Sequence, residues 1–466
     1  MKRFLTVCLL ILTLVLTAFL GSCAQDGATG PQGERGEQGE RGEAGLQGEK
    51  GENGKDGVGV AEVRVVDGEL IIAYTDGREE SLGNIGELIR TDDLIYYPLD
   101  DGTYAVGIGN SVYLSEIVIP EEHNGRPVSA IAYNGFAKSN NLRRITIPKS
   151  VKTIDANAFY NCKSLNTVNI PNDIEVIGEG AFYGCTNLSY NEYDGGKYLG
   201  SQENPYIILV DVDGDETGSL TVNENARFIH SEAFSGCQLT EVVIGENIKS
   251  IGGSMFSGCA TLESLTLPFL GDGESEGHIG YVFGASSFSS NGSKVPASLK
   301  NVTILSAEKI SDDAFNSCKY LEKIVLPENV KKIGKRAFYN CTNLAEIEIP
   351  KSVTEIGDYA FFNCLRITSI EIPEGVSVIS ENSFRSCVKL ETVELPDSIN
   401  YIGYAAFYGC EVLKRIYIPI GVERIENDAF RGCIALSIYC EAPKRPRGWN
   451  IDWNYSGCVV VWGWNS

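Results

Sequence analysis

The sequence predicts a repeat solenoid, in which short parallel β-strands stack along one axis. Six phenylalanines, six cysteines and five prolines each recur every 23 residues near the C-terminus. They are Phe315, Phe338, Phe361, Phe384, Phe407 and Phe430; Cys318, Cys341, Cys364, Cys387, Cys410 and Cys433; and Pro327, Pro350, Pro373, Pro396 and Pro419. A fixed period between about 20 and 50 residues is typical of stacked repeats rather than of one globular core. A solenoid offers a long regular surface, which suits binding better than an enclosed reaction.

One unit, residues 344–364, shows how each coil is expected to form. Apolar residues alternate through 346–349, which is the period of a strand with one buried face. Pro350 then ends the strand, because proline cannot donate to the ladder. The apolar residues that follow, up to Phe361, are spaced so that a short helical or 3₁₀ turn can bury them on one side. A unit this short cannot form a core alone, but stacked copies bury a continuous one.

The repeat pattern L-x-x-I-x-I-P-x-x-V-x-x-I-G-x-x-A-F-x-x-C resembles the BspA-like class of leucine-rich repeats found in bacterial surface proteins. The likeness covers about 110–466, and places the solenoid at 136–436 with insertions at 188–225 and 269–300. It implies a parallel β face with short turns, 3₁₀ or α segments on the return path. It also implies a non-enzymatic, adhesin-like protein that binds other proteins.

The N-terminus predicts export and lipid anchoring. Two basic residues precede an apolar run that ends in small residues, so 1–22 has the pattern of a secretory signal peptide. Residues 20–23, Leu-Gly-Ser-Cys, resemble a bacterial lipobox, which makes Cys23 the lipidation site and 23–26 the lipidated N-terminus. The alternatives are a plain signal peptide with a chance cysteine or an uncleaved anchor helix. The lipoprotein interpretation places the chain at the bacterial cell surface, attached to the membrane through its lipid.

Residues 27–57 repeat glycine at every third position. This strict G-X-Y pattern resembles bacterial collagen-like stalks, because only glycine fits at the axis of three wound chains. The tract holds a single proline, Pro31, so it is equally compatible with a homotrimeric stalk and with an unassembled charged tether.

Three further segments flank the repeats. Residues 58–86 contain two Asp-Gly turn signals next to apolar runs and predict a small β module, which is favoured as a connector, with a junction or a trimer clamp as the alternatives. Residues 87–135 predict an N-terminal cap with short strands. All four tryptophans fall within 437–466, which predicts a C-terminal cap that seals the hydrophobic stack. The alternative for this aromatic cluster is a glycan-binding platform.

Composition excludes several function classes. The formal net charge of −23 disfavours binding to nucleic acid or to anionic lipid. None of the three histidines stands near a second His or Cys at metal-ligand spacing, and no nucleophile, zinc-protease or phosphate-loop motif is present. We therefore predict no catalytic residues, no metal and no cofactor.

The cysteines divide into two groups. Ten recur in register within the repeats, where equivalent positions behave as a column of small buried apolar residues, so we predict free thiols. Cys440 and Cys458 lie outside this register, and a disulfide between them is possible in an exported chain.

The outward-facing strand positions give the candidate ligand face. In successive repeats the residue between the two buried aliphatics is Glu348, Glu371, Glu394 and then Tyr417. Neighbouring strands lie about 4.8 Å apart, so the three glutamates should form a row of like charges, which costs stability. The row is either a recognition element for a basic protein or simply a solvated face.

Lipid anchor, stalk, β module and solenoid thus follow one another from membrane to ligand. The sequence favours a surface-displayed lipoprotein that binds a host or bacterial surface protein. A structural surface-assembly protein without one specific ligand is the first alternative, and a glycan-binding module the second.

Overall fold

In the computed structural model of this chain, the described residues are 60–66, 69–84, 94–108, 114–271 and 277–465. The predicted signal peptide, Cys23 and the G-X-Y tract lie outside the described residues.

Residues 58–86, expected to hold a small β module, contain a three-stranded sheet. Its strands, in spatial order, are β1 (Val60–Val66), β2 (Glu69–Tyr74) and β3 (Glu79–Asn84). The pair β2–β3 is antiparallel, and its turn uses Gly77 at a φ of 85°, a conformation that glycine adopts without steric cost.

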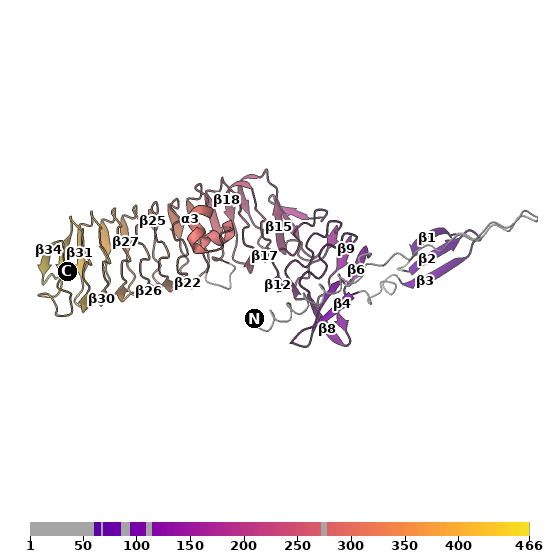
Figure 1. Cartoon of the computed structure of the whole chain (residues 1–466), viewed down its shortest axis with the longest axis horizontal. Coiled ribbons are helices and arrows are strands. Elements are labelled where there is room, and N and C mark those ends of the chain that lie inside the picture. The colour runs from indigo at the N-terminus through magenta and orange to yellow at the C-terminus, as the bar shows by residue number, and fades with distance from the viewer. Residues whose placement is uncertain (1–59, 67–68, 85–93, 109–113, 272–276, 466) are drawn as a thin grey trace, which may run out of the picture. The chain divides into compact units, whose positions relative to one another are not determined.

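The rest of the described chain forms a β-solenoid with coils of about 23 residues, which confirms the predicted fold class. Figure 1 shows its strands side by side along one axis. Each regular coil contributes one strand to each of two parallel ladders, because alternating apolar residues bury one face of each strand. The proline after the first strand separates the two.

The first ladder contains the outward-facing positions of the candidate ligand face. It runs in three blocks. These are β6 (Glu116–Val118), β9 (Arg144–Thr146) and β11 (Thr167–Val168); β16 (Thr217–Thr221), β18 (Gln238–Val243), β20 (Ser264–Leu267), β21 (Asn301–Ile304), β23 (Lys323–Val325) and β25 (Glu346–Ile347); and β27 (Ser369–Glu371), β29 (Thr392–Glu394), β31 (Arg415–Ile418), β33 (Ser437–Cys440) and β34 (Val459–Trp462).

The second ladder has shorter strands and runs in four blocks. These are β8 (Arg126–Ile131), β10 (Thr153–Ile154) and β12 (Val176–Ile177); β15 (Ile208–Val212), β17 (Phe228–Ile229) and β19 (Ser250–Ile251); β22 (Lys309–Ile310), β24 (Lys332–Ile333) and β26 (Glu355–Ile356); and β28 (Val378–Ile379), β30 (Tyr401–Ile402) and β32 (Arg424–Ile425). At the N-terminal end, β4 (Leu94–Pro98), β5 (Tyr104–Ile108) and β7 (Glu122–His123) extend the first of these blocks.

A column of stacked phenylalanine rings forms the centre of the core. From Phe315 to Phe430 each ring lies 5.1 to 5.6 Å from the next, and every ring in this run is fully buried. The step between rings matches the spacing of stacked strands, so one aromatic per coil is enough to fill the core.

The repeat cysteines are free and buried beside this column. The thiol of Cys364 donates to the carbonyl oxygen of Phe338 in the preceding coil, at 3.2 Å, and most of the repeat cysteines share this contact. Burial raises the pKa of Cys341 and of Cys387 to about 12, so these thiols stay neutral. The arrangement agrees with the prediction of a buried thiol column.

Two residues in each coil have left-handed backbone conformation, two positions before the phenylalanine and two positions after it. In one coil these are Arg336, at a φ of 54°, and Asn340, at a φ of 59°. The second position holds only Gly, Asn, Ser or Lys in every repeat, because few side chains tolerate this region. These two positions close the tight turn that places Phe and Cys inside.

The first insertion, 188–225, replaces one regular coil. It contains the antiparallel pair β13 (Asn191–Tyr193) and β14 (Gly196–Leu199), and β15 continues from it into the second ladder. The first ladder stops at β11 and resumes at β16. This coil brings no phenylalanine turn, so the column is interrupted between Phe182 and Phe234.

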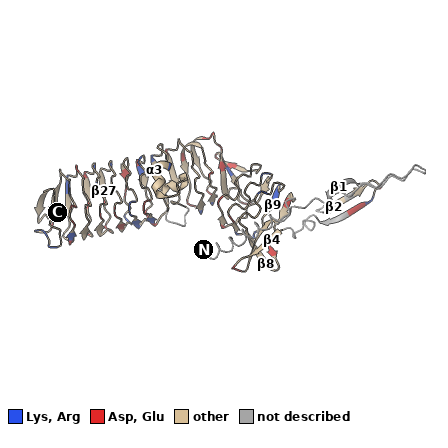
Figure 2. Ribbon diagram, viewed as in Figure 1, with Lys and Arg blue, Asp and Glu red and all other residues tan. Residues whose placement is uncertain are grey.

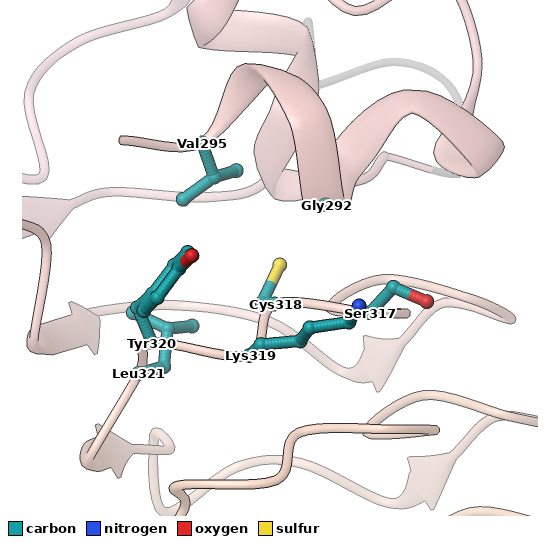
Figure 3. A pocket seen from close by; sticks show the side chains of 7 residues that line it. All are labelled: Gly292, Val295, Ser317, Cys318, Lys319, Tyr320 and Leu321. Atoms are coloured by element: carbon teal, nitrogen blue, oxygen red, sulfur yellow. The ribbon is translucent and has the colours of Figure 1, made fainter. Parts of the chain in front are cut away.

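The second insertion, 269–300, adds one further ring to the column instead. It contains η2 (Ile279–Phe283), η3 (Phe288–Ser290) and α3 (Asn291–Lys294). Phe283 takes the place of a repeat phenylalanine, 5.7 Å from Phe256. Figure 3 shows the crevice between α3 and the turn 317–321, where the Cys318 sulfur points towards the helix. The crevice has no room for a water molecule, so α3 packs closely against this turn.

Candidate ligand-binding face

The candidate face is the exposed side of the first ladder near its C-terminal end. Glu371 in β27 and Glu394 in β29 are direct partners across the parallel pair, and both side chains are exposed. The residue before each glutamate, Ile370 or Val393, points to the opposite side of the sheet and is buried in the core. The alternation of buried and exposed residues therefore places two like charges in adjacent strands, as the repeat register predicts.

Glu348 does not join this row as expected. Strand β25 ends at Ile347, and the first ladder is interrupted between β25 and β27. Glu348 is exposed, but it lies outside the strand. The evenly spaced three-glutamate row is thus corrected to one paired couple, Glu371 and Glu394, with Glu348 one coil away. A sequence period fixes which residues are equivalent, but hydrogen bonding between coils decides whether their strands pair.

Neighbouring charges on the same face are compensated across coils. Lys323 lies 3.0 Å from Glu346, and Lys414 lies 2.5 Å from Glu391, whose pKa this contact lowers. Among the described residues, no ion pair neutralises Glu371 or Glu394 in the same way. Figure 2 shows both signs of charge interspersed along the coils. The couple is available to a cationic partner.

An aromatic cluster follows the glutamates along the ladder. Tyr417 in β31 is in register with Tyr439 in β33, and their rings lie 5.2 Å apart. Trp464 lies 4.9 Å from Tyr439 and is partly exposed. Sequence reasoning identified Tyr417 but missed Tyr439 and Trp464. Tyr439 follows Tyr417 after 22 residues, close to the repeat length of 23. This near-repeat spacing is the sequence signal that could have identified Tyr439.

The other tryptophans do not form an open platform. Trp449 and Trp453 are buried, and Trp453 packs edge-on against Phe430, the last ring of the column, at 6.0 Å. The indole N–H of Trp449 donates to the carbonyl oxygen of Val422 at 3.0 Å. Both side chains therefore seal the end of the hydrophobic core.

Cys440 and Cys458 are not joined, contrary to the disulfide considered from sequence. Both are free cysteines. Cys440 is in register with Trp462, whereas the Cys458 sulfur lies 3.4 Å from the carbonyl oxygen of Cys433. The strand pairing in the C-terminal cap thus gives each cysteine a different neighbour.

The described residues offer neither a metal site nor a membrane-spanning helix. This part of the chain has no group of three or more His, Cys, Asp or Glu placed to hold a metal ion. Within the same residues, no helix is long and apolar enough to cross a bilayer.

The family comparison identifies the repeat. The model for the BspA-type leucine-rich repeat region matches residues 109–199, 214–272 and 308–437, which is more than half of the chain. No curated protein matches the sequence.

Several solved structures are similar to the chain. A leucine-rich repeat protein from Bacteroides ovatus is 25% identical, with 79% of this chain and 90% of that chain covered and a TM-score of 0.35. A leucine-rich cell surface protein from Faecalibacterium prausnitzii is 26% identical, with 74% and 92% covered and a TM-score of 0.26. An internalin from Listeria monocytogenes is 16% identical, with 61% and 81% covered and a TM-score of 0.25. By its repeat period, its β-solenoid and the match over 109–199, 214–272 and 308–437, the chain belongs to the family of BspA-type leucine-rich repeat proteins.

Proposed function

We propose that this protein is a surface-displayed, adhesin-like lipoprotein whose solenoid binds a protein ligand through the face formed by Glu371, Glu394, Tyr417, Tyr439 and Trp464. The observation that carries the proposal is the uncompensated Glu371–Glu394 couple beside an exposed aromatic cluster. Aromatic side chains dominate the binding energy of many protein interfaces, and charge directs the approach of the partner. The partner is a host or bacterial surface protein with a basic segment.

The chemistry of this face specifies the partner further. Glu371 and Glu394 accept charge-assisted hydrogen bonds from lysine or arginine. The rings of Tyr417 and Tyr439 offer faces on which an arginine guanidinium can stack. A basic segment laid across the first ladder would meet both features in successive coils.

Charge reversal tests this face. The change of Glu371 and Glu394 to Lys is expected to abolish binding to a basic partner captured from host-surface or bacterial extracts. Both side chains point away from the core, so the circular dichroism spectrum should not change. A second variant, Glu348→Lys, serves as the matched control because Glu348 lies outside the paired strands. Wild-type binding should weaken as salt rises, since exposed charges are screened beyond about 10 Å at 0.1 M. Unchanged, salt-insensitive binding by the double variant would reject this face.

We also propose that the N-terminal segment places the protein at the bacterial cell surface. Export and acylation of Cys23 would hold the chain at the bacterial surface, and the G-X-Y tract would space the solenoid from the membrane. Cys23→Ser should release the protein from the membrane fraction, with mass spectrometry of the mature N-terminus as the measurement. An unmodified Cys23 in the wild-type protein would contradict lipid anchoring.

A structural surface-assembly role is the second candidate, and the G-X-Y repeat of 27–57 favours it. A collagen-like tract would join three chains into a homotrimer. Sedimentation equilibrium of the full chain distinguishes the two roles when combined with the capture experiment. A trimer that captures no partner favours assembly.

A further inference from the structure

The interruption of the phenylalanine column leaves an open groove on the solenoid surface. Phe159 and Phe182 stack at 5.3 Å on one side of the break, and Phe234 and Phe256 stack at 4.7 Å on the other. Within the described residues no ring contact joins the two stacks. The coil 188–225 passes between them without a phenylalanine turn, so the turn side of the solenoid is not filled there.

A second aromatic column, on the surface, ends at this break. The residue that follows each core phenylalanine points outward, and Tyr160 and Tyr183 stack there with centroids 5.5 Å apart and planes 11° apart. The equivalent residue beyond the break is Ser235. Tyr160 covers one side of Tyr183, no ring among the described residues stacks on the other, and Tyr183 is 46% exposed. The column therefore stops at an aromatic ring that borders open space.

The open space is large enough for a sugar. One hollow of about 440 Å³ is lined by Tyr160, Tyr183 and residues across the break, and an adjoining hollow of about 370 Å³ extends to Lys138. The two share Asn157 and Tyr160, so they form one groove. Its size is in the range of small-molecule binding sites.

Polar groups line the groove opposite the tyrosine. Glu232, Ser231 and Ser254 come from the coils beyond the break, and Glu179 comes from the coil before it. Carboxylates accept hydrogen bonds from hydroxyl groups, and serine hydroxyls both donate and accept. Two carboxylates at this position also disfavour an anionic ligand.

Below the groove, a small cavity contains a histidine with one ring nitrogen that lacks a hydrogen-bond partner. The cavity, about 80 Å³, shares Glu179, Ser231 and Gly253 with the larger hollow. His230 lines it, is 7% exposed, and its Nε2 atom has no hydrogen-bond partner. Burial lowers the pKa of His230 to about 4, so the ring is neutral at pH 7. An unpartnered buried polar atom is costly, and a ligand hydroxyl or a bridging water would satisfy it.

We propose that this groove binds a neutral pyranose glycan, with one sugar ring stacked on Tyr183 as the next member of the outer column. The C–H groups on one side of a pyranose are weakly positive and match the negative face of an aromatic ring. The ring hydroxyls would bond to Glu179, Glu232 and the two serines. The site is separate from the proposed protein-binding face, so either can fail without the other.

The regular array shows how Tyr183 differs from the residues at the equivalent positions. At the equivalent outer positions, the Tyr339 and Phe362 rings stack at 4.7 Å, and the guanidinium of Arg385 lies 4.4 Å from the Tyr408 ring. Arg431 follows, 5.7 Å from the same ring. Arg385 and Arg431 already lie against the ring of Tyr408. A sugar therefore has no room to stack on this tyrosine, although it occupies the same repeat position as Tyr183.

Saturation-transfer NMR on the full chain provides the first test. The probes are cellobiose, mannobiose, lactose and N,N′-diacetylchitobiose, with sialyllactose as the anionic comparison. At least one neutral disaccharide should receive saturation, and sialyllactose should receive less. Absence of transfer to all four neutral sugars, or preference for sialyllactose, would overturn the proposal.

Matched variants locate the site. Tyr183→Ala should weaken binding of the best disaccharide about tenfold or more in calorimetry, the scale of one lost stacking contact. Tyr408→Ala, the same change in the filled column, should leave sugar affinity unaltered, and Tyr183→Phe should retain it. Equal affinities for Tyr183→Ala and wild type would place any sugar site elsewhere. Circular dichroism of each variant separates lost binding from lost fold.

Discussion

The coils from Phe315 to Phe430 and those from Phe136 to Phe256 are built from one repeat, yet they differ in continuity. In the first region every ring stacks on the next, and its outer column is also continuous. In the second, the insertion at 188–225 interrupts both columns and leaves a groove with a buried histidine. In a regular stack, equivalent side chains of adjacent coils pack against one another, so few hollows are left between the coils. At 188–225 the departure from the repeat leaves a hollow in which a small ligand can bind.

Removal of a core phenylalanine should separate the two regions most clearly. Phe361 lies between two rings at 5.1 and 5.3 Å, whereas Phe182 stacks on one side only. Phe361→Ala should cost ~3–5 kcal/mol of unfolding free energy, with Phe182→Ala at the low end of that range. Urea denaturation gives both values. A larger cost for Phe182→Ala would contradict the assignment of Phe182 to a column end.

The buried histidine should give the interrupted region its own pH dependence. The pKa of His230 is about 4 in the fold, against about 6.5 in an unfolded chain, so only the unfolded chain is protonated between these values. The free energy of unfolding should therefore fall by about 3 kcal/mol as the pH drops through this window.

The variant His230→Gln provides the matched measurement, because it removes the titrating group. The difference between wild-type and variant stability should shrink or reverse from pH 7 to pH 4. Parallel stability curves would show that His230 does not titrate as its burial requires.

An ion pair between a buried carboxylate and a partly exposed arginine should distinguish the regular region. Asp313 is 2% exposed, and Arg336 in the next coil bonds to both of its carboxylate oxygens at 2.8 Å. Arg336→Ala should cost about 2 kcal/mol, because a buried carboxylate loses its cation. Lys332→Ala, which removes an exposed pair with Glu355, should cost about 0.5 kcal/mol. Similar losses of unfolding free energy for the two variants would show that burial of Asp313 does not strengthen its pair with Arg336.

The smallest expected effect concerns backbone conformation. Asn363 has a φ of 60°, and its side-chain amide donates to Asn340 in the preceding coil at 2.8 Å. Asn363→Val should cost ~1 kcal/mol because a β-branched residue is strained there. Asn363→Gly should come close to wild type. A tolerated valine would mean that the turn can relax, and the left-handed position would not explain the residue choice.

Much of the fold follows from local pattern. The period of Phe361 and Cys364 gave the coil length, the alternation before Pro350 gave the strand, and the residues allowed before each cysteine reflect a left-handed turn. The candidate face was found in part: Glu371, Glu394 and Tyr417 are exposed on it, as the alternation required. The prediction that Glu348 pairs with Glu371 was wrong, because the first ladder is interrupted between their strands.

The sequence by itself determined the solenoid, its register and its buried columns, because each depends on a spacing that repeats every 23 residues. Tertiary structure alone decided what happens where the spacing changes. It placed Phe283 against Phe256 at one insertion, left Tyr183 at an open end at the other, and brought Trp464 beside Tyr439. These contacts join residues with no fixed sequence offset, and only the packing of whole coils brings them together.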